Sequence, residues 1–452
     1  MLVRIITGLV GWVASIFLRI ERSGPPIPSG PVLVVANHPN SLLDPLVLFR
    51  TAGRPTRPLA KAPLFEQAIL GAVLRGLGGL PVYRRQDDPA LMDRNDETFA
   101  RAVEALHAGD AVQIYPEGKS HSDPELAPMR TGAARIALRA EAERNWALGL
   151  VIVPIGLTYR RKSLFRGTVL ATIGEPFEVG PWRATFAADP AEAVRSLTAA
   201  ISGRLRELTL NLTEQEHHEL IDVAERLYAR ERGLARARER EPLAERLPRM
   251  HRFAEALAWL RAHDPTELDR LIRSVRRYAQ LARRTGAAEG DVPARYEAVP
   301  TARFVIRETL VLGLALPLAA VGTVLWYPTF LAPRFVLPRI RPDPEAVATY
   351  KLATGFVTVP LTLLVVGAAG TWLGGAGTGL AAAALAFALG LIAIAWHERW
   401  RRVREDALLF LQLLRRPRVG PALAARRSRL AADFDRVLAR MPGDDTAVHS
   451  GA

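Results

Sequence analysis

The sequence predicts an α/β protein, with a mixed sheet flanked by helices, a helical middle region and transmembrane helices near the carboxyl terminus. Two observations lead to this prediction. In the first 185 residues, short apolar runs rich in β-branched side chains alternate with helical stretches, which is typical of a sheet covered by helices. After residue 300, three long runs lack charged side chains, and each is near the roughly 20 residues that a membrane-spanning helix needs.

Composition excludes several classes of site. The chain has 452 residues, no cysteine and a formal net charge of +14. Without cysteine there are no disulfides, thiolate metal sites or cysteine nucleophiles. No group of His, Asp and Glu has metal-ligand spacing, and His217 and His218 are expected to be solvated on a charged helix. We therefore predict no metal. Arginines interleave with glutamates without a nucleic-acid-binding signature, so we predict membrane lipids as partners and no nucleic acid.

The amino-terminal segment is expected to lie on a membrane surface. Between Arg4 and Arg19 there are 14 residues without charge, too few to span a bilayer. No small-residue cleavage site clearly follows, so a signal peptide is the less favoured interpretation. We predict a retained interfacial helix over residues 1–24.

The first motif combines a histidine and an aspartate at a strand-to-helix junction. A buried strand from Val32 to Ala36 leads to His38 in a turn, and Asp44 follows six residues later. An imidazole with one nitrogen held by a carboxylate can take a proton on its other nitrogen, as a general base does. The hydroxyl that it activates can belong to the substrate. The alternative is an ordinary Asn-His-Pro-Asn loop with a structural histidine.

Three further blocks follow in order. Gly79–Asp87 indicates a short strand that leads to Arg84 and the neighbouring Arg85. Val112–Ser122 indicates a second strand that ends in a Pro-Glu-Gly turn, and Val151–Tyr159 indicates a third. A last strand is predicted over 168–176.

These four blocks resemble those of the glycerolipid O-acyltransferase (PlsC-like) superfamily, over about a third of the chain. The residues at 80–87 and 116–121 are most similar to the fungal-type glycerol-3-phosphate/dihydroxyacetone-phosphate acyltransferases. Two features depart from the common superfamily pattern. Five residues, not four, separate His38 from Asp44, and Lys119-Ser120 stand where Thr-Arg is usual.

The resemblance implies transfer of a fatty acyl group from acyl-CoA or acyl carrier protein to the hydroxyl of glycerol 3-phosphate or dihydroxyacetone phosphate, in phospholipid biosynthesis. His38 would be the general base and Asp44 its orienting partner. The thioester is a co-substrate and not a bound cofactor. Alternatives are a 1-acylglycerol-3-phosphate (lysophosphatidic acid) acyltransferase, a lysophospholipid acyltransferase and, in another class, a noncatalytic membrane scaffold.

Substrate-binding candidates follow from the same blocks. The planar guanidinium of Arg84 matches the oxygens of an acceptor phosphate. Gly118 permits close backbone approach, and the amides around it suit an anion. Glu117 is expected to organise its loop, and Lys61 could equally be a solvated surface charge. The full set of substrate-binding candidates is Lys61, Arg84, Glu117, Gly118, Lys119 and Ser120.

Basic residues flank the charge-free runs and set the predicted topology. Positive-inside reasoning places these flanks in the cytoplasm, and the active site with them. We therefore expect 352–396 to form a hairpin with its tip at 374–377, and 309–332 to be re-entrant or interfacial around Pro317 and Gly322. The protein would be integral to the membrane, the cytoplasmic one in a bacterium.

The predicted organisation is an interfacial helix at 1–24, an acyltransferase domain at 25–185, a helical region at 186–302, a membrane region at 303–398 and a basic helical tail at 399–452.

Overall fold

The computed structural model describes residues 2–83, 94–212, 215–234, 241–284, 298–415 and 419–442. The chain divides into two compact units. The first comprises Met1–Gln215, Pro242–Leu247 and Pro342–Thr349, and the second comprises Glu216–Glu241, Pro248–Arg341 and Tyr350–Ala452.

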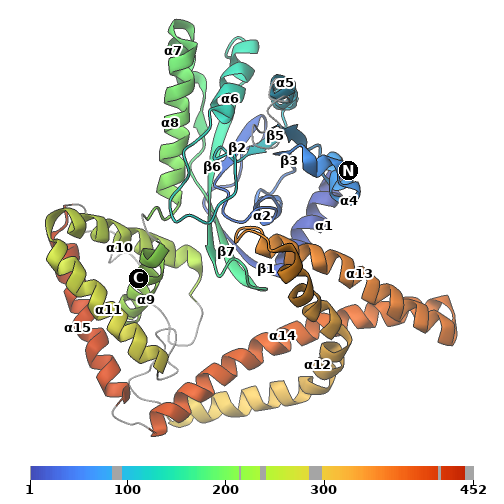
Figure 1. Ribbon diagram of the computed structural model, residues 1–452, viewed down its shortest axis with the longest axis vertical. Coiled ribbons are helices and arrows are strands. Elements are labelled where there is room, and N and C mark those ends of the chain that lie inside the picture. The colour runs from blue at the N-terminus through green and yellow to red at the C-terminus, as the bar shows by residue number, and fades with distance from the viewer. Residues whose placement is uncertain are drawn as a thin grey trace. The chain divides into compact units, whose positions relative to one another are not determined.

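The first unit is built around a twisted sheet (Figure 1). Its strands are β1 (Leu18–Ser23), β2 (Val32–Ala36), β3 (Thr56–Lys61), β4 (Leu80–Val82), β5 (Ala111–Ile114), β6 (Val151–Arg160), β7 (Gly167–Ile173) and β8 (Phe177–Glu178). Its helices are α1 (Leu2–Phe17), α2 (Leu43–Thr51), α3 (Pro63–Glu66), α4 (Ala68–Gly76), α5 (Arg94–His107), α6 (Gly132–Glu143), α7 (Arg183–Ala188) and α8 (Pro190–Leu208).

The sheet is mixed, as predicted. Its order is β1-β7-β6-β2-β5-β3-β4, and β8 pairs with β6. All pairs are parallel except β6 with β7 and β6 with β8. The four strands predicted from the sequence blocks correspond to β2, β4, β5 and β6, and the predicted last strand to β7. The expected α/β class is confirmed.

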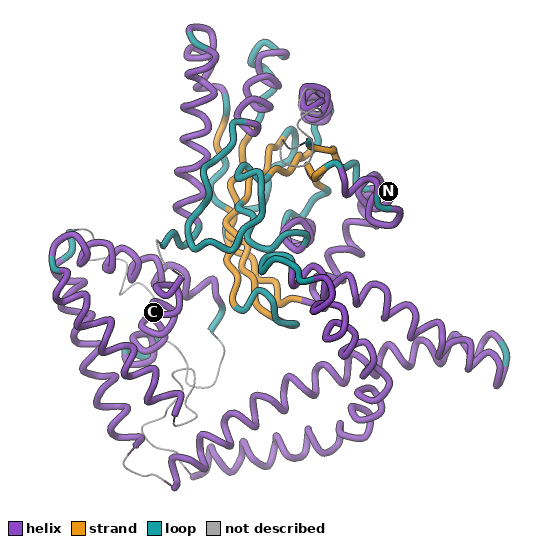
Figure 2. The backbone as a smooth tube through the Cα atoms, in the orientation of Figure 1, coloured by secondary structure: helices purple, strands orange, loops and turns teal. Residues whose placement is uncertain are grey.

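Strand β2 is the centre of the sheet and is buried on both faces. Leu33 and Val35 join the core formed with α5, α6 and α8. Val32 and Val34 are equally buried and point to the opposite face, because successive side chains alternate across a strand. A strand covered on both faces reads as a continuous apolar run, which is why this one was evident in the sequence. Figure 2 shows the helices on either side of the strands.

The sheet begins earlier than the predicted domain start at residue 25. Helix α1 ends at Phe17, and Leu18–Ser23 forms β1, which pairs in parallel with β7 from Leu18 opposite Gly167 onward. Leu18 is fully buried there, and Arg166 Nη1 donates to the carbonyl of Ser15 at 2.6 Å. Residues 1–24 are therefore a helix followed by an edge strand, because β7 offers a pairing partner that the local sequence does not reveal.

The second unit is helical. Its elements are α9 (Gln215–Glu231), α10 (Leu243–His263), α11 (Pro265–Arg284), α12 (Ala298–Ile340), α13 (Val347–Gly374), α14 (Ala376–Arg415) and α15 (Val419–Arg440). The first residues of α9, α10 and α13, which are Gln215, 243–247 and 347–349, group with the first unit. The rings of Tyr228, Phe253 and Phe434 meet edge to face between α9, α10 and α15. His217 on α9 is only 5% exposed, so the expectation that it is solvated is wrong.

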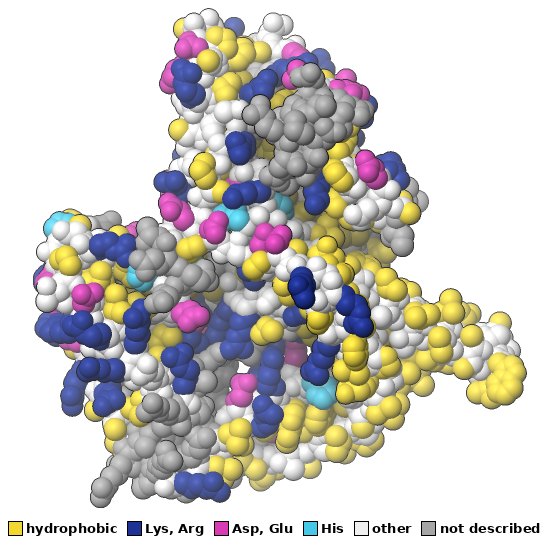
Figure 3. Space-filling view, viewed as in Figure 1, with side chains coloured by type: hydrophobic (Ala, Val, Ile, Leu, Met, Phe, Trp, Pro, Cys, Tyr) yellow, Lys and Arg dark blue, Asp and Glu magenta, His cyan; other side chains and the backbone are white. Residues whose placement is uncertain are grey.

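Three helices are long and apolar enough to cross a membrane: Arg303–Ile340, Val347–Gly374 and Ala376–Glu405. Large apolar side chains such as Leu314, Val324 and Trp372 are at least three-quarters exposed on them. Figure 3 shows this apolar surface over α13 and α14. Exposed apolar faces of this length are expected where lipid is the solvent.

Helix α12 packs antiparallel to α14. Arg399 Nε donates to Glu308 Oε2 at 2.5 Å, Trp396 Nε1 donates to the carbonyl of Leu312 at 2.9 Å, and Trp326 Nε1 donates to the carbonyl of Ala386 at 2.9 Å. The helix is continuous through Pro317 and Gly322, so it has no re-entrant turn there, and the interfacial alternative stays a prediction. Gly322 instead permits close packing, since a Cβ there would lie 2.2 Å from the Leu389 carbonyl oxygen.

The predicted hairpin over 352–396 is confirmed as a pair of helices. Helix α13 ends at Gly374, Gly375 adopts φ +82°, and α14 begins at Ala376. A Cβ on Gly370 would lie 3.0 Å from the Cα of Gly379, so the two helices are close near the tip. Helix α14 continues past the predicted boundary at 398 to Arg415.

Candidate active site

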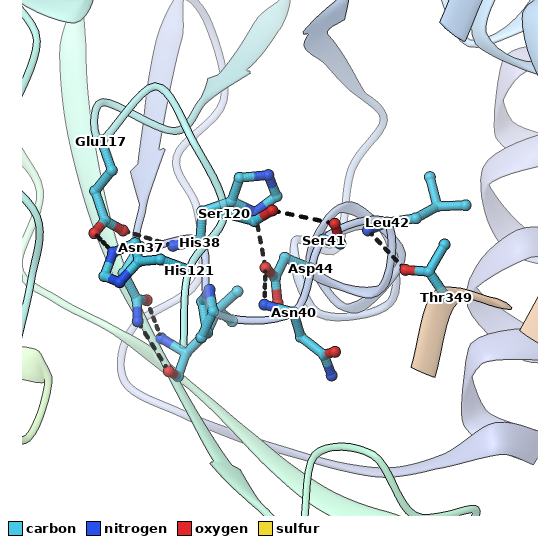
Figure 4. A network of polar contacts seen from close by, with 12 residues as sticks. Asn37, His38, Asn40, Ser41, Leu42, Asp44, Glu117, Ser120, His121 and Thr349 are labelled. Carbon is cyan, nitrogen blue, oxygen red and sulfur yellow. Dashed lines mark hydrogen bonds and ion pairs between the residues drawn. The ribbon is translucent and has the colours of Figure 1, made fainter. Parts of the chain in front are cut away.

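His38 and Asp44 form a hydrogen-bonded pair where β2 gives way to α2. His38 follows the buried strand, and Asp44 lies in the first turn of the helix. His38 Nδ1 lies 2.8 Å from Asp44 Oδ2 (Figure 4). Between them Ser41 adopts φ +48°, a conformation that tightens the turn formed by the five intervening residues. The carboxylate is fully buried and the imidazole side chain is 13% exposed, so Nε2 is the nitrogen left to exchange a proton.

Two further donors fix the Asp44 carboxylate. The backbone N–H of Asn40 donates to Oδ2 at 2.8 Å, and the hydroxyl of Tyr159 donates to Oδ1 at 2.7 Å. Burial, followed by the charge of Asp44, raises the pKa of Tyr159 well above its usual value. The phenol therefore keeps its proton and remains a donor. A carboxylate held on both oxygens can fix the ring orientation and tautomer of the histidine.

The imidazole is also supported by an aromatic ring. Tyr115 follows β5 and stacks on His38 with ring centroids 4.1 Å apart and planes at 15°. Its hydroxyl is buried and has no hydrogen-bond partner among the described residues. Burial, with a smaller contribution from the Asp44 charge, raises the pKa of Tyr115 well above its usual value.

Glu117 joins the Pro-Glu-Gly turn to the histidine loop. Its Oε1 accepts from the backbone N–H of His38 at 2.8 Å, and its Oε2 accepts from the backbone N–H of Ala127 at 2.9 Å. The ring of His121 bonds to the same Oε2. Gly118 follows with φ +71°, where a side chain is unfavourable. Both oxygens of Glu117 are thus engaged within the protein, which fits the expectation that it organises the loop.

The structure brings only some of the substrate-binding candidates to this junction. Ser120 Oγ lies 3.1 Å from Ser41 Oγ and so borders the His38–Asp44 turn. Lys119 is exposed beside it, and Lys61 is exposed at the end of β3. Arg84 and Arg85 lie outside the described residues, just after β4. The substrate-binding roles of all these residues stay predictions.

Sequence reasoning missed a cation beside the pair. Lys162 Nζ donates to Ser122 Oγ at 2.7 Å and to the carbonyl of Pro39 at 3.2 Å. Burial lowers the pKa of Lys162, while the charges of Asp44, Glu345 and Asp123 act in the opposite direction. The only local signal was the rarity of lysine, since Lys162 is one of four in the chain. In the part of the chain that the structure describes, no three His, Asp or Glu side chains gather as a metal-binding group.

Comparisons with known proteins concern this part of the chain. The Acyltransferase family model matches residues 19–158. Glycerol-3-phosphate O-acyltransferase 2 of Saccharomyces cerevisiae is 35% identical over 135 residues, which are 30% of this chain and 18% of that protein. A chloroplastic 1-acyl-sn-glycerol-3-phosphate acyltransferase of Brassica napus is 28% identical over 138 residues, 30% of this chain and 36% of that protein. The chain thus spans about a fifth of the yeast relative and about a third of the plant one.

Among solved structures, the 1-acyl-sn-glycerophosphate acyltransferase PlsC of Thermotoga maritima is similar with a TM-score of 0.34 and 19% identity, over 46% of this chain and 81% of that one. The motif blocks, the matched segment and the curated relatives agree on one assignment. Residues 19–158 thus match the Acyltransferase family model, and the curated relatives named above are acyltransferases.

Proposed function

We propose that this protein is a membrane-bound glycerolipid acyltransferase. It transfers a fatty acyl group from a coenzyme A or carrier-protein thioester to the hydroxyl of glycerol 3-phosphate or dihydroxyacetone phosphate. The observation that carries the proposal is the 2.8 Å contact between His38 Nδ1 and Asp44 Oδ2, which leaves Nε2 to act as a base.

The proposed reaction needs no nucleophile from the protein. His38 Nε2 takes the proton of the acceptor hydroxyl while the oxygen of that hydroxyl attacks the thioester carbonyl carbon. The tetrahedral intermediate collapses, the carbon–sulfur bond breaks, and the imidazolium returns its proton to the thiolate. Asp44 stabilises the imidazolium and holds the ring in place through Nδ1. Backbone amides around Gly118, together with Ser120, are the candidates to bind the oxyanion or an anionic part of the substrate.

The preference for a glycerol phosphate acceptor rests on similarity. The yeast relative with the higher identity is named a glycerol-3-phosphate O-acyltransferase. Arg84, with Lys61 and Lys119, would supply cations for the acceptor phosphate. The plant relative is named a 1-acyl-sn-glycerol-3-phosphate acyltransferase, so lysophosphatidic acid is the second candidate acceptor.

The proposed location is a membrane, with the active site on the cytoplasmic side. Three apolar helices of sufficient length support the membrane assignment, and the basic residues at their flanks support the orientation. A noncatalytic scaffold is the alternative of another class. It gives no reason for a buried carboxylate held by three donors beside a partly exposed histidine.

The test is an acyl-transfer assay on purified, detergent-solubilised full-length protein. Labelled palmitoyl-coenzyme A is offered with glycerol 3-phosphate, dihydroxyacetone phosphate or lysophosphatidic acid as the acceptor. We expect product from glycerol 3-phosphate or dihydroxyacetone phosphate, and a loss of about 10²–10⁴-fold in His38→Ala. His263→Ala is the matched control, because His263 is an exposed histidine at the end of α10. Unchanged activity in His38→Ala would refute the mechanism. Product only with lysophosphatidic acid would select the second acceptor.

If palmitoyl-coenzyme A gives no product, the assay is repeated with palmitoyl-acyl carrier protein. Product with this donor alone would identify the carrier-protein thioester as the substrate. A lack of product with both donors and all three acceptors would support the scaffold instead.

A further inference from the structure

The linker segment 342–349 follows α12, includes the first turn of α13 and belongs to the acyltransferase unit. Residues Pro342–Thr349 group with the sheet domain, although most of both flanking helices belongs to the second unit. These helices are two of the three candidate membrane spans. A segment that connects membrane helices thus contributes residues to the unit that contains His38 and Asp44.

Thr349 contacts the start of the helix that carries Asp44. Its Oγ1 accepts a hydrogen bond from the backbone N–H of Leu42 at 3.2 Å (Figure 4). Leu42 is the N-cap residue of α2 and supplies no side-chain cap of its own. Amide groups at the start of a helix have no acceptor within the helix. A residue 307 positions later therefore provides an acceptor at this helix start.

Glu345 contacts the other side of the junction through two intermediates. Ser122 Oγ donates to Glu345 Oε2 at 3.3 Å, and the same Oγ accepts from Lys162 Nζ at 2.7 Å. Lys162 Nζ also donates to the carbonyl of Pro39, the residue after His38, at 3.2 Å. A chain of hydrogen bonds thus connects the linker to the backbone beside the imidazole. Glu345 also contributes a negative charge that favours the ammonium form of Lys162.

We propose that Glu345 and Thr349 are positioning residues for the His38–Asp44 pair, so that the linker 342–349 is a working part of the active site. This inference rests on the proposed function. Thr349 holds the first turn of α2 and with it Asp44. Glu345, through Ser122 and Lys162, holds the Pro39 peptide and with it His38.

The proposal has a topological consequence. Because the linker contacts the catalytic junction, it lies on the same side of the membrane as His38. The carboxyl end of α12 and the amino end of α13 then reach that side as well. The basic residues between the first two charge-free runs, which include Arg339, Arg341 and Lys351, indicate the same side by the positive-inside rule. The proposal reaches this side from contacts and not from charge.

The contact itself can be tested without any activity measurement. The chain contains no cysteine, so Ser122→Cys/Glu345→Cys is the only reactive pair in the full-length protein. In lipid vesicles, a short bis-maleimide should join positions 122 and 345, and mass spectrometry of the cross-linked peptides identifies the product. Each single-cysteine variant should give no such peptide, and the pair unfolded in detergent before the reagent is added should give much less of it than the folded pair. Absence of the cross-link in the folded pair would overturn the contact.

The positioning role is tested by kinetics. Thr349→Val keeps the shape but removes the acceptor, and we expect kcat to fall by about three- to tenfold, the rate equivalent of one hydrogen bond, with KM for both substrates changed by less than about twofold. Thr349→Ser should restore kcat. Thr358→Val is the matched control, because the hydroxyl of Thr358 bonds within its own helix to the Thr354 carbonyl.

Glu345 gives an independent comparison. Glu345→Gln retains an oxygen acceptor for the Ser122 hydroxyl, whereas Glu345→Leu does not. We therefore expect Glu345→Leu to lower kcat more than Glu345→Gln does. An unchanged kcat per folded enzyme in both Thr349→Val and Glu345→Leu would overturn the positioning role. If His38→Ala kept full activity while the cross-link formed, the proposed mechanism would fail but the linker contact would stand.

Discussion

The ring of Tyr115 lies flat against the imidazole of His38, with centroids 4.1 Å apart, and its buried hydroxyl is unpartnered among the described residues. Stacking restrains the ring, whereas the hydroxyl contributes no bond within the protein. An unsatisfied buried polar group costs about 1–3 kcal/mol. We therefore predict that Tyr115→Phe leaves kcat within about threefold of wild type. Its free energy of unfolding should be unchanged or higher, by up to about 3 kcal/mol.

Tyr115→Ala separates the two properties of the ring. Loss of the stacked surface should lower both kcat and stability, the latter by about 3–5 kcal/mol as for other buried aromatic truncations. Assays and thermal unfolding in detergent measure the two effects. A large loss of kcat in Tyr115→Phe at unchanged stability would show that the hydroxyl contacts substrate.

The bond from Tyr159 to Asp44 predicts graded effects on the base. Tyr159→Phe removes one of three donors to the carboxylate, so kcat should fall by about three- to tenfold. Asp44→Asn removes the charge that stabilises the imidazolium and should cost at least about 10²-fold. The pH dependence of kcat/KM measures whether the base itself has changed. Equal losses in the two variants would contradict this ranking.

Lys162 predicts a stability change at alkaline pH. Burial lowers its pKa from the usual 10.5, so the folded protein binds fewer protons than the unfolded chain between the two pKa values. The free energy of unfolding from this group therefore rises as the pH rises through that interval. Lys162→Met has no titratable group at this position. The melting temperature of wild type, relative to that of this variant, should therefore rise as the pH approaches 10.5. A relative loss over the same interval would mean that the charges around Lys162 outweigh its burial.

Two glycines of α12 form a matched pair for testing the packing against α14. A Cβ at Gly322 would lie 2.2 Å from the carbonyl oxygen of Leu389, whereas nothing lies within 4 Å of a Cβ at Gly313. Gly322→Ala should therefore destabilise the protein in detergent by about 1–3 kcal/mol, through overpacking. Gly313→Ala should be neutral or slightly stabilising, because alanine favours the helix. Equal melting temperatures for the two variants would argue against the α12–α14 contact.

The sequence revealed those features whose cause is local. The apolar run Val32–Ala36 identified the central strand, and the short interval between His38 and Asp44 allowed their pairing to be foreseen. Gly374 and Gly375 likewise indicated the turn between the two apolar helices α13 and α14. In each case, a few consecutive residues determine the conformation.

Features that depend on distant partners were missed. Residues 18–23 become a strand only because β7 lies beside them, and Gly322 is a packing site only because α14 is adjacent. Tyr159 and Thr349 reach the His38–Asp44 junction from positions 115 and 307 residues away from their partners. No spacing rule in a single sequence connects residues over such intervals, and only the fold brings them together.

Glu117 holds two loops together through backbone amides, those of His38 and Ala127, and not through their side chains. Such a link survives substitution of the residues it joins, provided that the backbone path is kept. The exposed positions of the loop between Glu117 and Ala127, such as Lys119 and Glu125, can then vary without loosening His38. For an engineer who wishes to change which acceptor the enzyme takes, this loop is a surface to randomise around a fixed Glu117.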